Sequence, residues 1–407
     1  MLAWLALCGW SAAAEAQSLP SEPLVFARGR VTIGGDVSGT YSCANADPNH
    51  GCGEDLGFFN YSSYDQSLLR SFRIDLTAAV KAGDRITFLT EIRTENFNHL
   101  EPYALYVRVR PWTHGPIDIQ AGRIPPTFGA FSRRPYPSDN PLIGYPMAYQ
   151  YLISLRPDAV PASADELIAM RGRGWLSRFS IGDTTPRSGL PFVNGLRWDT
   201  GVQVHAGTDW MDVAGAITTG TLANPLVRDD NAGKQLSGRA SVRPVVGMVL
   251  GVSAAQGPYV NRAAAVSAGL PEDDRSLTQT AFGVDAEYAR GYYVVRFETV
   301  LSRWRVPLIR APYPQLPLRS SATSIEGRYK LMPGLYAAAR WDYLGFNEIT
   351  GSAGPRTWEA PVTRVEAGAG YSIRRNILLK GSYQHNDRDG GRVRASSIVA
   401  TQIVYWF

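Results

Sequence analysis

The chain ends with Val399-Ala400-Thr401-Gln402-Ile403-Val404-Tyr405-Trp406-Phe407, in which apolar and aromatic side chains recur at every second position. Successive side chains of a strand point to opposite sides. One face of the expected strand therefore carries Val399, Thr401, Ile403, Tyr405 and Phe407. At the edge of a soluble domain such a strand would expose an apolar face and an unpaired backbone. A closed barrel avoids this exposure because its last strand pairs with its first, so this segment predicts a β-barrel.

This ending resembles the C-terminal signature of Gram-negative outer-membrane barrels, with Ile403, Tyr405 and Phe407 in the place of the membrane-insertion residues. The resemblance implies an outer-membrane location in a Gram-negative bacterium. It also implies three partners: the lipid bilayer, lipopolysaccharide and the barrel-assembly machinery.

The N-terminal residues predict export from the cytoplasm. Residues 1–16 form an apolar run followed by small residues, and Ala14-Glu15-Ala16 fits an A-x-A cleavage site. The run is shorter than the roughly 20 apolar residues that a spanning helix needs. We therefore expect a cleaved signal peptide over 1–16 and a mature chain that begins near Gln17.

Composition favours one large barrel over several domains. The chain has 407 residues, 44% of them hydrophobic, and no stretch after residue 20 has the length and apolarity of a membrane helix. Membrane barrels have this weak hydropathy because polar lumen-facing residues alternate with apolar ones. No Pro/Ser-rich linker or block of charge divides the sequence, so we expect 17–407 to form a single barrel.

Segments of about ten residues alternate apolar and polar side chains through most of the chain. In one example, Phe72, Ile74, Leu76, Ala78 and Val80 alternate with Arg73, Asp75 and Thr77. A soluble sandwich and a membrane barrel both show this periodicity, with the polar face outside in the first and inside in the second. The signal peptide, the terminal strand and the strand length favour the membrane barrel.

The spacing of turns and loops predicts the number of strands. Seven short turns alternate with eight longer connections, and fifteen connections join 16 antiparallel strands. The segment 124–194 is counted as one loop in this scheme. It contains two strand-like pieces, 148–155 and 174–181, and a hairpin formed by them would raise the number to 18.

Cys43 and Cys52 lie nine residues apart in a segment rich in Gly, Asn and Asp, and the third cysteine, Cys8, belongs to the signal peptide. Two nearby cysteines in an exported chain predict a disulfide. His50 lies between them, but no further ligand at metal-site spacing follows. We expect neither a metal nor another cofactor.

The start of the long loop resembles a segment of phosphate-selective porins. Gly122-Arg123-Ile124-Pro125-Pro126-Thr127-Phe128-Gly129 is similar to their Gly-Arg-x-x-Pro-Phe-Gly, with one inserted Thr. The likeness implies a porin-type barrel with an inward-folded third loop over 124–194 that narrows the pore. The loop contains no Lys, whereas phosphate selectivity in that family is associated with lysines and a stepped path of arginines.

The arginines suggest where anions would pass. Only four of the 41 basic residues are Lys, and rings of aligned charge set selectivity in pores. Arg108 and Arg110 lack an acid nearby on their own strand, and Arg133 and Arg134 lie in the long loop. We expect these four arginines to form a constriction together with Tyr106, Tyr136 and Asp139.

The sequence predicts a porin that passes small hydrophilic solutes by passive diffusion, with a mild preference for anions. Two alternatives remain open: a substrate-specific channel for sugars or carboxylates, and a non-conducting structural or adhesive barrel. No HExxH, CxxC, GxSxG or Walker motif is present, so we do not expect an enzyme. The arginines are spread over many strands, which argues against nucleic-acid binding. By analogy with porins we expect a homotrimer.

Overall fold

The computed structural model describes residues 20–47, 51–63, 66–98, 100–112 and 115–407. The expected signal peptide over 1–16 lies outside the described residues. None of the helices in the described part of the chain is both long and apolar enough to cross a bilayer.

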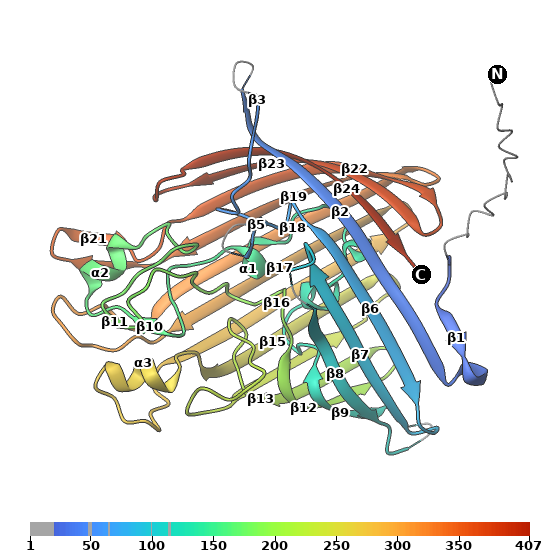
Figure 1. Ribbon diagram of the computed structural model, residues 1–407, viewed down its shortest axis with the longest axis horizontal. Coiled ribbons are helices and arrows are strands. Elements are labelled where there is room, and N and C mark those ends of the chain that lie inside the picture. The colour runs from blue at the N-terminus through green and yellow to red at the C-terminus, as the bar shows by residue number, and fades with distance from the viewer. Residues whose placement is uncertain (1–19, 48–50, 64–65, 99, 113–114) are drawn as a thin grey trace, which may run out of the picture.

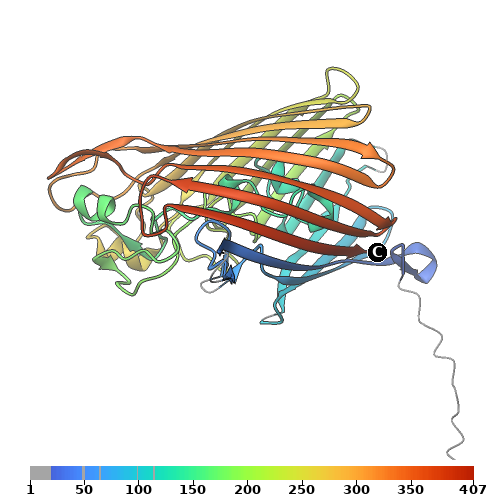
Figure 2. The same ribbon diagram turned by 90° about the horizontal axis from the view of Figure 1, so that it is seen from above.

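Sixteen long antiparallel strands form a closed ring in the described residues, and Figures 1 and 2 show this barrel from the side. The main sheet has 18 strands. Two of them, β1 and β3, are not part of the ring and pair only with β2. In ring order the wall strands are β2 (Val31–Asp47), β6 (Phe72–Lys81), β7 (Ile86–Glu95), β8 (Glu101–Val109), β9 (Ile117–Ile124), β12 (Asp199–Gly207), β13 (Met211–Thr218), β14 (Gln235–Val242), β15 (Met248–Pro258), β16 (Thr278–Arg290), β17 (Tyr293–Trp304), β18 (Leu318–Met332), β19 (Leu335–Phe346), β22 (Val362–Arg374), β23 (Ile377–Arg388) and β24 (Ala395–Trp406). The prediction of a 16-stranded barrel is confirmed.

The ring closes between its first and last strands, as the terminal segment predicted. β24 pairs antiparallel with β2, with Tyr405 opposite Val37 and Ile403 opposite Gly39. Figure 2 shows this red strand beside the blue one. Phe407 extends the pairing beyond β24, because its N–H donates to the carbonyl of Gly35 at 3.0 Å.

The remaining described elements are short and lie in the connections. They are β1 (Leu24–Phe26), β3 (Gly51–Gly53), β4 (Tyr61–Ser63), β5 (Gln66–Ser67), β10 (Ala159–Val160), β11 (Ile181–Gly182), β20 (Glu348–Gly351), β21 (Gly354–Thr357), the 3-10 turns η1 (Ala27–Gly29), η2 (Phe131–Arg133) and η3 (Pro137–Asp139), and the helices α1 (Met147–Gln150), α2 (Ala164–Ala169) and α3 (Arg262–Ser267).

The alternative of 18 wall strands is wrong. Of the two strand-like pieces in the long loop, 148–155 begins in α1 and 174–181 contributes only an isolated bridge from Ser177 to Arg187 and the first residue of β11. β11 pairs with β10 in a separate two-stranded sheet. The connection between β9 and β12 therefore runs over 125–198, slightly longer than the expected 124–194.

The two faces of the wall are inverted relative to a soluble protein. Large apolar side chains such as Val204, Leu301 and Val365 are about half exposed on the outside. Charged side chains such as Asp75, Arg340 and Glu366 are at most 2% exposed on the inside. This is the arrangement of a barrel whose outer face contacts lipid.

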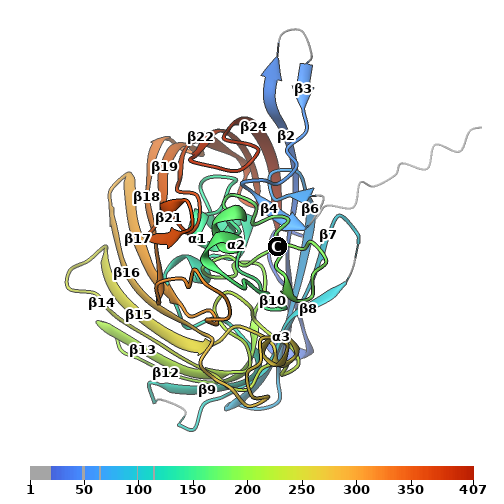
Figure 3. The same cartoon turned by 90° about the vertical axis from the view of Figure 1, so that its left-hand side faces the viewer.

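A disulfide joins Cys43 on β2 to Cys52 on β3, which confirms the predicted pairing. β2 pairs with β6 only as far as Gly39 opposite Phe72, and it then continues into a hairpin with β3. Figure 3 shows this hairpin projecting from the barrel outline.

The disulfide is predicted to stabilise the hairpin alone. Replacing both cysteines by serine should leave the unheated, folded band on a denaturing gel unchanged, because the sixteen-stranded ring does not include β3. Proteolysis between β2 and β3 should become faster, since closing a loop of about ten residues stabilises by about 2.5 kcal/mol. Reduced wild-type protein is the control, and loss of the folded band would contradict the prediction.

Candidate functional site

The connection 125–198 enters the barrel as the chain leaves β9. Thr127 Oγ1 lies 2.6 Å from Ser237 Oγ on β14, and the N–H of Gly129 donates to Ser253 Oγ on β15 at 3.1 Å. Both serines are lumen-facing wall residues. The first part of the loop therefore follows the inner surface of the wall from strand to strand.

Glu298 on β17 anchors the next residues. Its carboxylate accepts hydrogen bonds from the N–H of Ala130 at 2.8 Å, the N–H of Phe131 at 3.3 Å and the hydroxyl of Tyr149 at 2.5 Å. Gly129 makes this approach possible, because it has a φ of +77° and a Cβ there would collide with Tyr149 Oη. One wall carboxylate thus joins two separate parts of the loop.

The loop then crosses the lumen within three residues. Arg134 Nη1 lies 3.0 Å from Glu326 Oε1 on β18, and Tyr136 donates its hydroxyl hydrogen to Glu91 Oε2 on β7 at 2.6 Å. Between them, the carbonyl of Pro135 accepts from Arg73 Nη2 on β6 at 2.8 Å. β18 and β7 are separated by six strands on one side of the ring and by eight on the other, so the segment 134–136 divides the lumen into two parts.

The part of the lumen beside β19 to β6 is filled by the loop. The carbonyl of Pro137 accepts from Lys380 Nζ at 2.6 Å, the N–H of Gly144 donates to Glu366 Oε1 at 3.0 Å, and Arg364 Nη1 donates to the carbonyl of Tyr145 at 3.1 Å. Arg364 and Glu366 have no exposed surface. Each of these wall charges binds the backbone of the loop, and Glu366 also pairs with Arg340 on β19 at 2.7 Å.

The loop contributes residues from before and after the crossing to a hydrophobic core inside the end of the barrel from which the long loops extend. Figure 3 shows α2 and β10 within the barrel outline. The core includes Phe128, Phe131, Tyr149, Phe179, Phe192, Trp304 and Trp358, each at most 2% exposed. Its apolar burial gives a long loop without regular strands a defined conformation.

A buried carboxylate ties this core to a second loop. Glu359, in the connection between β21 and β22, accepts from the N–H of Ser154 at 2.7 Å and also from the N–H of Gly172. Burial raises the pKa of Glu359, and the backbone N–H groups that bind the carboxylate act in the opposite direction. The loop 125–198 is thus held at its centre by the wall and at its outer end by a neighbouring loop.

The described residues leave two larger cavities in the part of the lumen beside β8 to β17. One of about 420 Å³ lies toward the long loops, where its lining includes Arg93, Glu101 and Arg197. The other, of about 260 Å³, lies toward the short turns, and its lining includes Arg133, Arg134, Asp212, Arg239, Arg243 and Asp285. The loop therefore leaves water-accessible space on both of its sides along this part of the wall.

The structure places the seven expected constriction residues at different depths. Arg133 is exposed in the smaller cavity, and Arg134 is bound to Glu326 at the edge of that cavity. Tyr136 is half-buried beside Glu91.

Tyr106 and Arg108 are half-buried on β8, whereas Arg110 is exposed just beyond that strand at the short-turn end. Asp139 is exposed at the end of η3, which packs near β2 and β24. Arg133 and Arg134 thus share one cavity lining, which Arg108 and Arg110 do not join.

Arg239 is a lumen residue that the sequence analysis did not identify. It lies on β14 and binds both oxygens of Asp285 on β16, with Nη2 to Oδ1 at 2.7 Å. β14 reads Gln-Leu-Ser-Gly-Arg-Ala-Ser-Val, and that arginine is its only charged side chain. The sequence around Arg239 does alternate between inward-facing and outward-facing residues. Most of its neighbours are small, however, so the strand pattern of this segment is weak.

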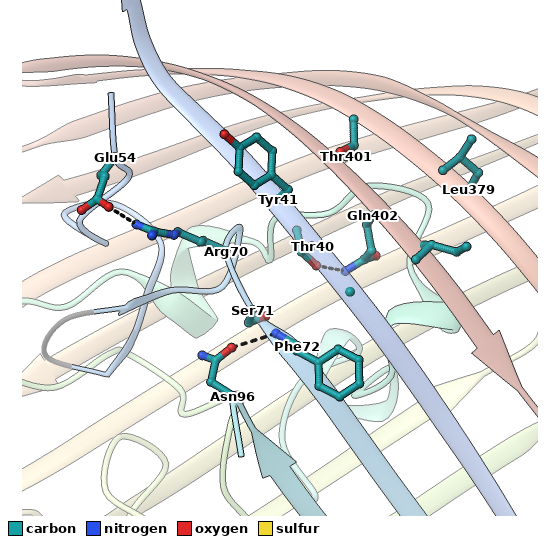
Figure 4. A pocket seen from close by; sticks show the side chains of 12 residues that line it. Thr40, Tyr41, Glu54, Arg70, Ser71, Phe72, Asn96, Leu379, Thr401 and Gln402 are labelled. Carbon is teal, nitrogen blue, oxygen red and sulfur yellow. Dashed lines mark hydrogen bonds and ion pairs between the residues drawn. The ribbon is translucent and has the colours of Figure 1, made fainter. Parts of the chain in front are cut away.

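A larger hollow of about 870 Å³ lies outside the lumen. Figure 4 shows it beside β2, between Phe72 on one side and Leu379 and Thr401 on the other, with the Arg70–Glu54 ion pair of 2.8 Å at its rim. Outward-facing side chains form much of this groove. It is therefore a feature of the external wall and not of the passage. The described residues contain no group of His, Cys, Asp and Glu side chains arranged to hold a metal ion.

Solved structures show that this fold is that of outer-membrane porins. The chain superposes on the outer membrane channel DcaP of Acinetobacter baumannii with a TM-score of 0.56 at 12% identity, covering 93% of this chain and 97% of DcaP. An anion-selective porin from Comamonas acidovorans gives a TM-score of 0.52 at 10% identity, covering 93% and 99%. OmpT, an outer membrane protein of Vibrio cholerae solved in a trimer form, gives 0.51 at 13% identity, covering 93% and 99%.

In contrast, no protein-family model matches the sequence, and no curated protein matches it. At identities of 10–13%, the structural likeness defines the fold alone.

Replacing Glu298 by alanine is predicted to loosen the loop while the wall stays intact. Three donors lose a charged acceptor, which costs about 3 kcal/mol or more. Amide hydrogen exchange should accelerate in 128–150 and remain slow in the wall strands. Glu287→Ala is the matched control, because Glu287 on β16 pairs with Arg296 on the neighbouring wall strand at 2.6 Å. Equal exchange in both variants would show that Glu298 does not anchor the loop.

Proposed function

We propose that this protein is an outer-membrane porin that passes small hydrophilic solutes by passive diffusion and mildly prefers anions. The observation that carries the proposal is the division of the lumen by 134–136, which leaves two polar cavities along the β8–β17 part of the wall. A barrel of sixteen strands is wide enough to enclose an aqueous channel. A loop anchored across it would narrow that channel without closing it.

Charge pairing on this side supports an anion preference. Asp285 is bound by Arg239, Glu326 is bound by Arg134, Arg296 and Arg340, and Glu298 is bound by the loop. Arg108 and Arg133 make no ion pair within the described residues. Asp285 and Glu326 beside the smaller cavity are therefore neutralised by arginines, and Arg108 and Arg133 contribute positive charge that a passing ion would encounter.

The expected setting follows from the outward face of the wall. Its exposed apolar side chains suit a bilayer, and we propose the Gram-negative outer membrane as its location. Lipopolysaccharide would then contact the outer half, and the barrel-assembly machinery would insert the chain. We also propose a homotrimer, which should appear as a trimeric mass in mild detergent without heating; a monomeric mass would contradict it.

Planar bilayers with asymmetric KCl test the proposed channel. Wild-type protein should form stable channels with an anion-favouring reversal potential. The double variant Arg108→Ala with Arg133→Ala should lower the anion-to-cation permeability ratio by about tenfold per charge removed. A unit charge about 6 Å from an ion contributes roughly 0.7 kcal/mol in water, and its removal costs the anion this attraction while it frees the cation from an equal repulsion, a difference of about 1.4 kcal/mol.

The matched control is Arg303→Ala, because Arg303 is exposed near the end of β17 with the parity of outward-facing Leu301. This variant should retain the wild-type reversal potential. If the wild-type channels conduct without preferring anions, Arg108 and Arg133 do not have the proposed role in selectivity. The absence of conductance from protein that shows a folded, heat-modifiable band would contradict the channel itself.

A substrate-specific channel is the second candidate. Tyr106 on β8 and Tyr136 in the crossing segment are half-buried aromatic side chains, and aromatic surfaces of this kind suit sugars. Conductance that a sugar or a carboxylate blocks in a saturable manner would favour this candidate over simple diffusion. A barrel without conductance would favour the structural or adhesive alternative.

A further inference from the structure

Three neighbouring wall strands bring a histidine between two carboxylates. His205 on β12 lies directly opposite Asp118 on β9, with Nδ1 3.7 Å from Asp118 Oδ2. Its other ring nitrogen, Nε2, lies 3.5 Å from Asp212 Oδ1 on β13. Each ring nitrogen therefore faces one carboxylate, and the three side chains come from β9, β12 and β13 at the short-turn end of the barrel.

Neighbouring residues allow the two carboxylates to lie close to the imidazole of His205. Gly207 follows His205 on the same face of β12, and a Cβ there would lie 2.5 Å from Asp212 Oδ1 and 3.2 Å from His205 Cε1. The absence of a side chain at Gly207 thus gives Asp212 room to approach the imidazole. Gln120 Nε2 also binds Asp118 Oδ1 at 2.9 Å and holds that carboxylate in place.

Other charged groups surround the trio from each neighbouring element. Asp212 on β13 is bound by Arg243, which directly follows the last residue of β14. On β8 the nearest lumen-facing charge is Arg108, and Arg110 follows just beyond the strand. From the loop, Arg133 lines the same cavity as Asp212, Arg243 and Arg239. With the imidazole neutral, the set of Asp118, Asp212 and Arg243 carries a net charge of about −1.

The imidazole is accessible from the passage. The side chains of His205, Asp118 and Asp212 are 27%, 15% and 13% exposed. They belong to the β8–β17 part of the wall, which the loop leaves unfilled, and Asp212 lines the smaller cavity. Protons and diffusing ions would therefore reach the same site.

We propose that His205 makes the ion selectivity of this channel depend on pH. Histidine is the side chain that ordinarily changes charge between about pH 5 and 8. Protonation would place an imidazolium between the two carboxylates and bring the local charge from about −1 to about 0. The wall would then attract cations less, so the anion preference would rise as the pH falls. The proposal rests on the proposed porin function and adds a specificity-determining residue to it.

The test is the reversal potential in asymmetric KCl, measured at about pH 5 and about pH 8. Wild-type channels should show a roughly tenfold higher anion-to-cation permeability ratio at the lower pH, because one unit charge near the ion path acts on the anion and on the cation with opposite sign. His205→Gln keeps a polar side chain that does not titrate and should lose most of this change. Asp118→Asn, which retains the imidazole and removes one carboxylate, should raise the ratio at both pH values.

The matched control is His385→Gln, because His385 is exposed on the outward face of β23, where Nδ1 lies 2.9 Å from Ser397 Oγ. It should retain the full wild-type dependence on pH. Channels whose selectivity is the same at both pH values, or a pH dependence that survives in His205→Gln, would overturn the role of His205 while leaving the porin intact. Folded protein without any conductance would overturn both.

Discussion

The pairing of β24 with β2 is the constraint on which the rest of the structure depends. In a bilayer every backbone N–H and C=O group needs a partner within the protein, and a sheet meets this requirement only when it closes. Closure here joins the first and last wall strands through a register from Ala44 opposite Ile398 to Asp36 opposite Trp406. It also creates an interior, because sixteen strands enclose more space than wall side chains alone can fill.

The loop 125–198 occupies much of that interior by using the charges of the wall. A buried ion needs partners, since removing it from water costs several kcal/mol. Arg364 and Glu366 are fully buried, and both bind backbone groups of the loop. The loop thus provides hydrogen bonds to wall charges that it also shields from water. Where it crosses, at Arg134 and Tyr136, it attaches to opposite sides of the ring.

This arrangement separates two kinds of lumen charge. Charges beside β19 to β6 hold the loop and are withdrawn from solvent, whereas Arg108, Arg133 and His205 remain accessible along β8 to β17. Only the second kind faces the proposed path of ions.

The sequence by itself determined the barrel, its inverted faces and its disulfide, and it predicted sixteen strands with eighteen as the alternative that the structure then excluded. Alternation with a period of two is a local property, and short turns between such segments specify antiparallel neighbours. The sequence also identified Arg133 and Arg134 as neighbours on the long loop. Only the tertiary structure decided that Arg134 is bound to Glu326 while Arg133 lines the smaller cavity. The meeting of His205 with Asp118 and Asp212 likewise depends on register across three strands. Contacts of this kind join residues that are distant in sequence, and a Pro-rich loop has no periodicity from which its path can be inferred.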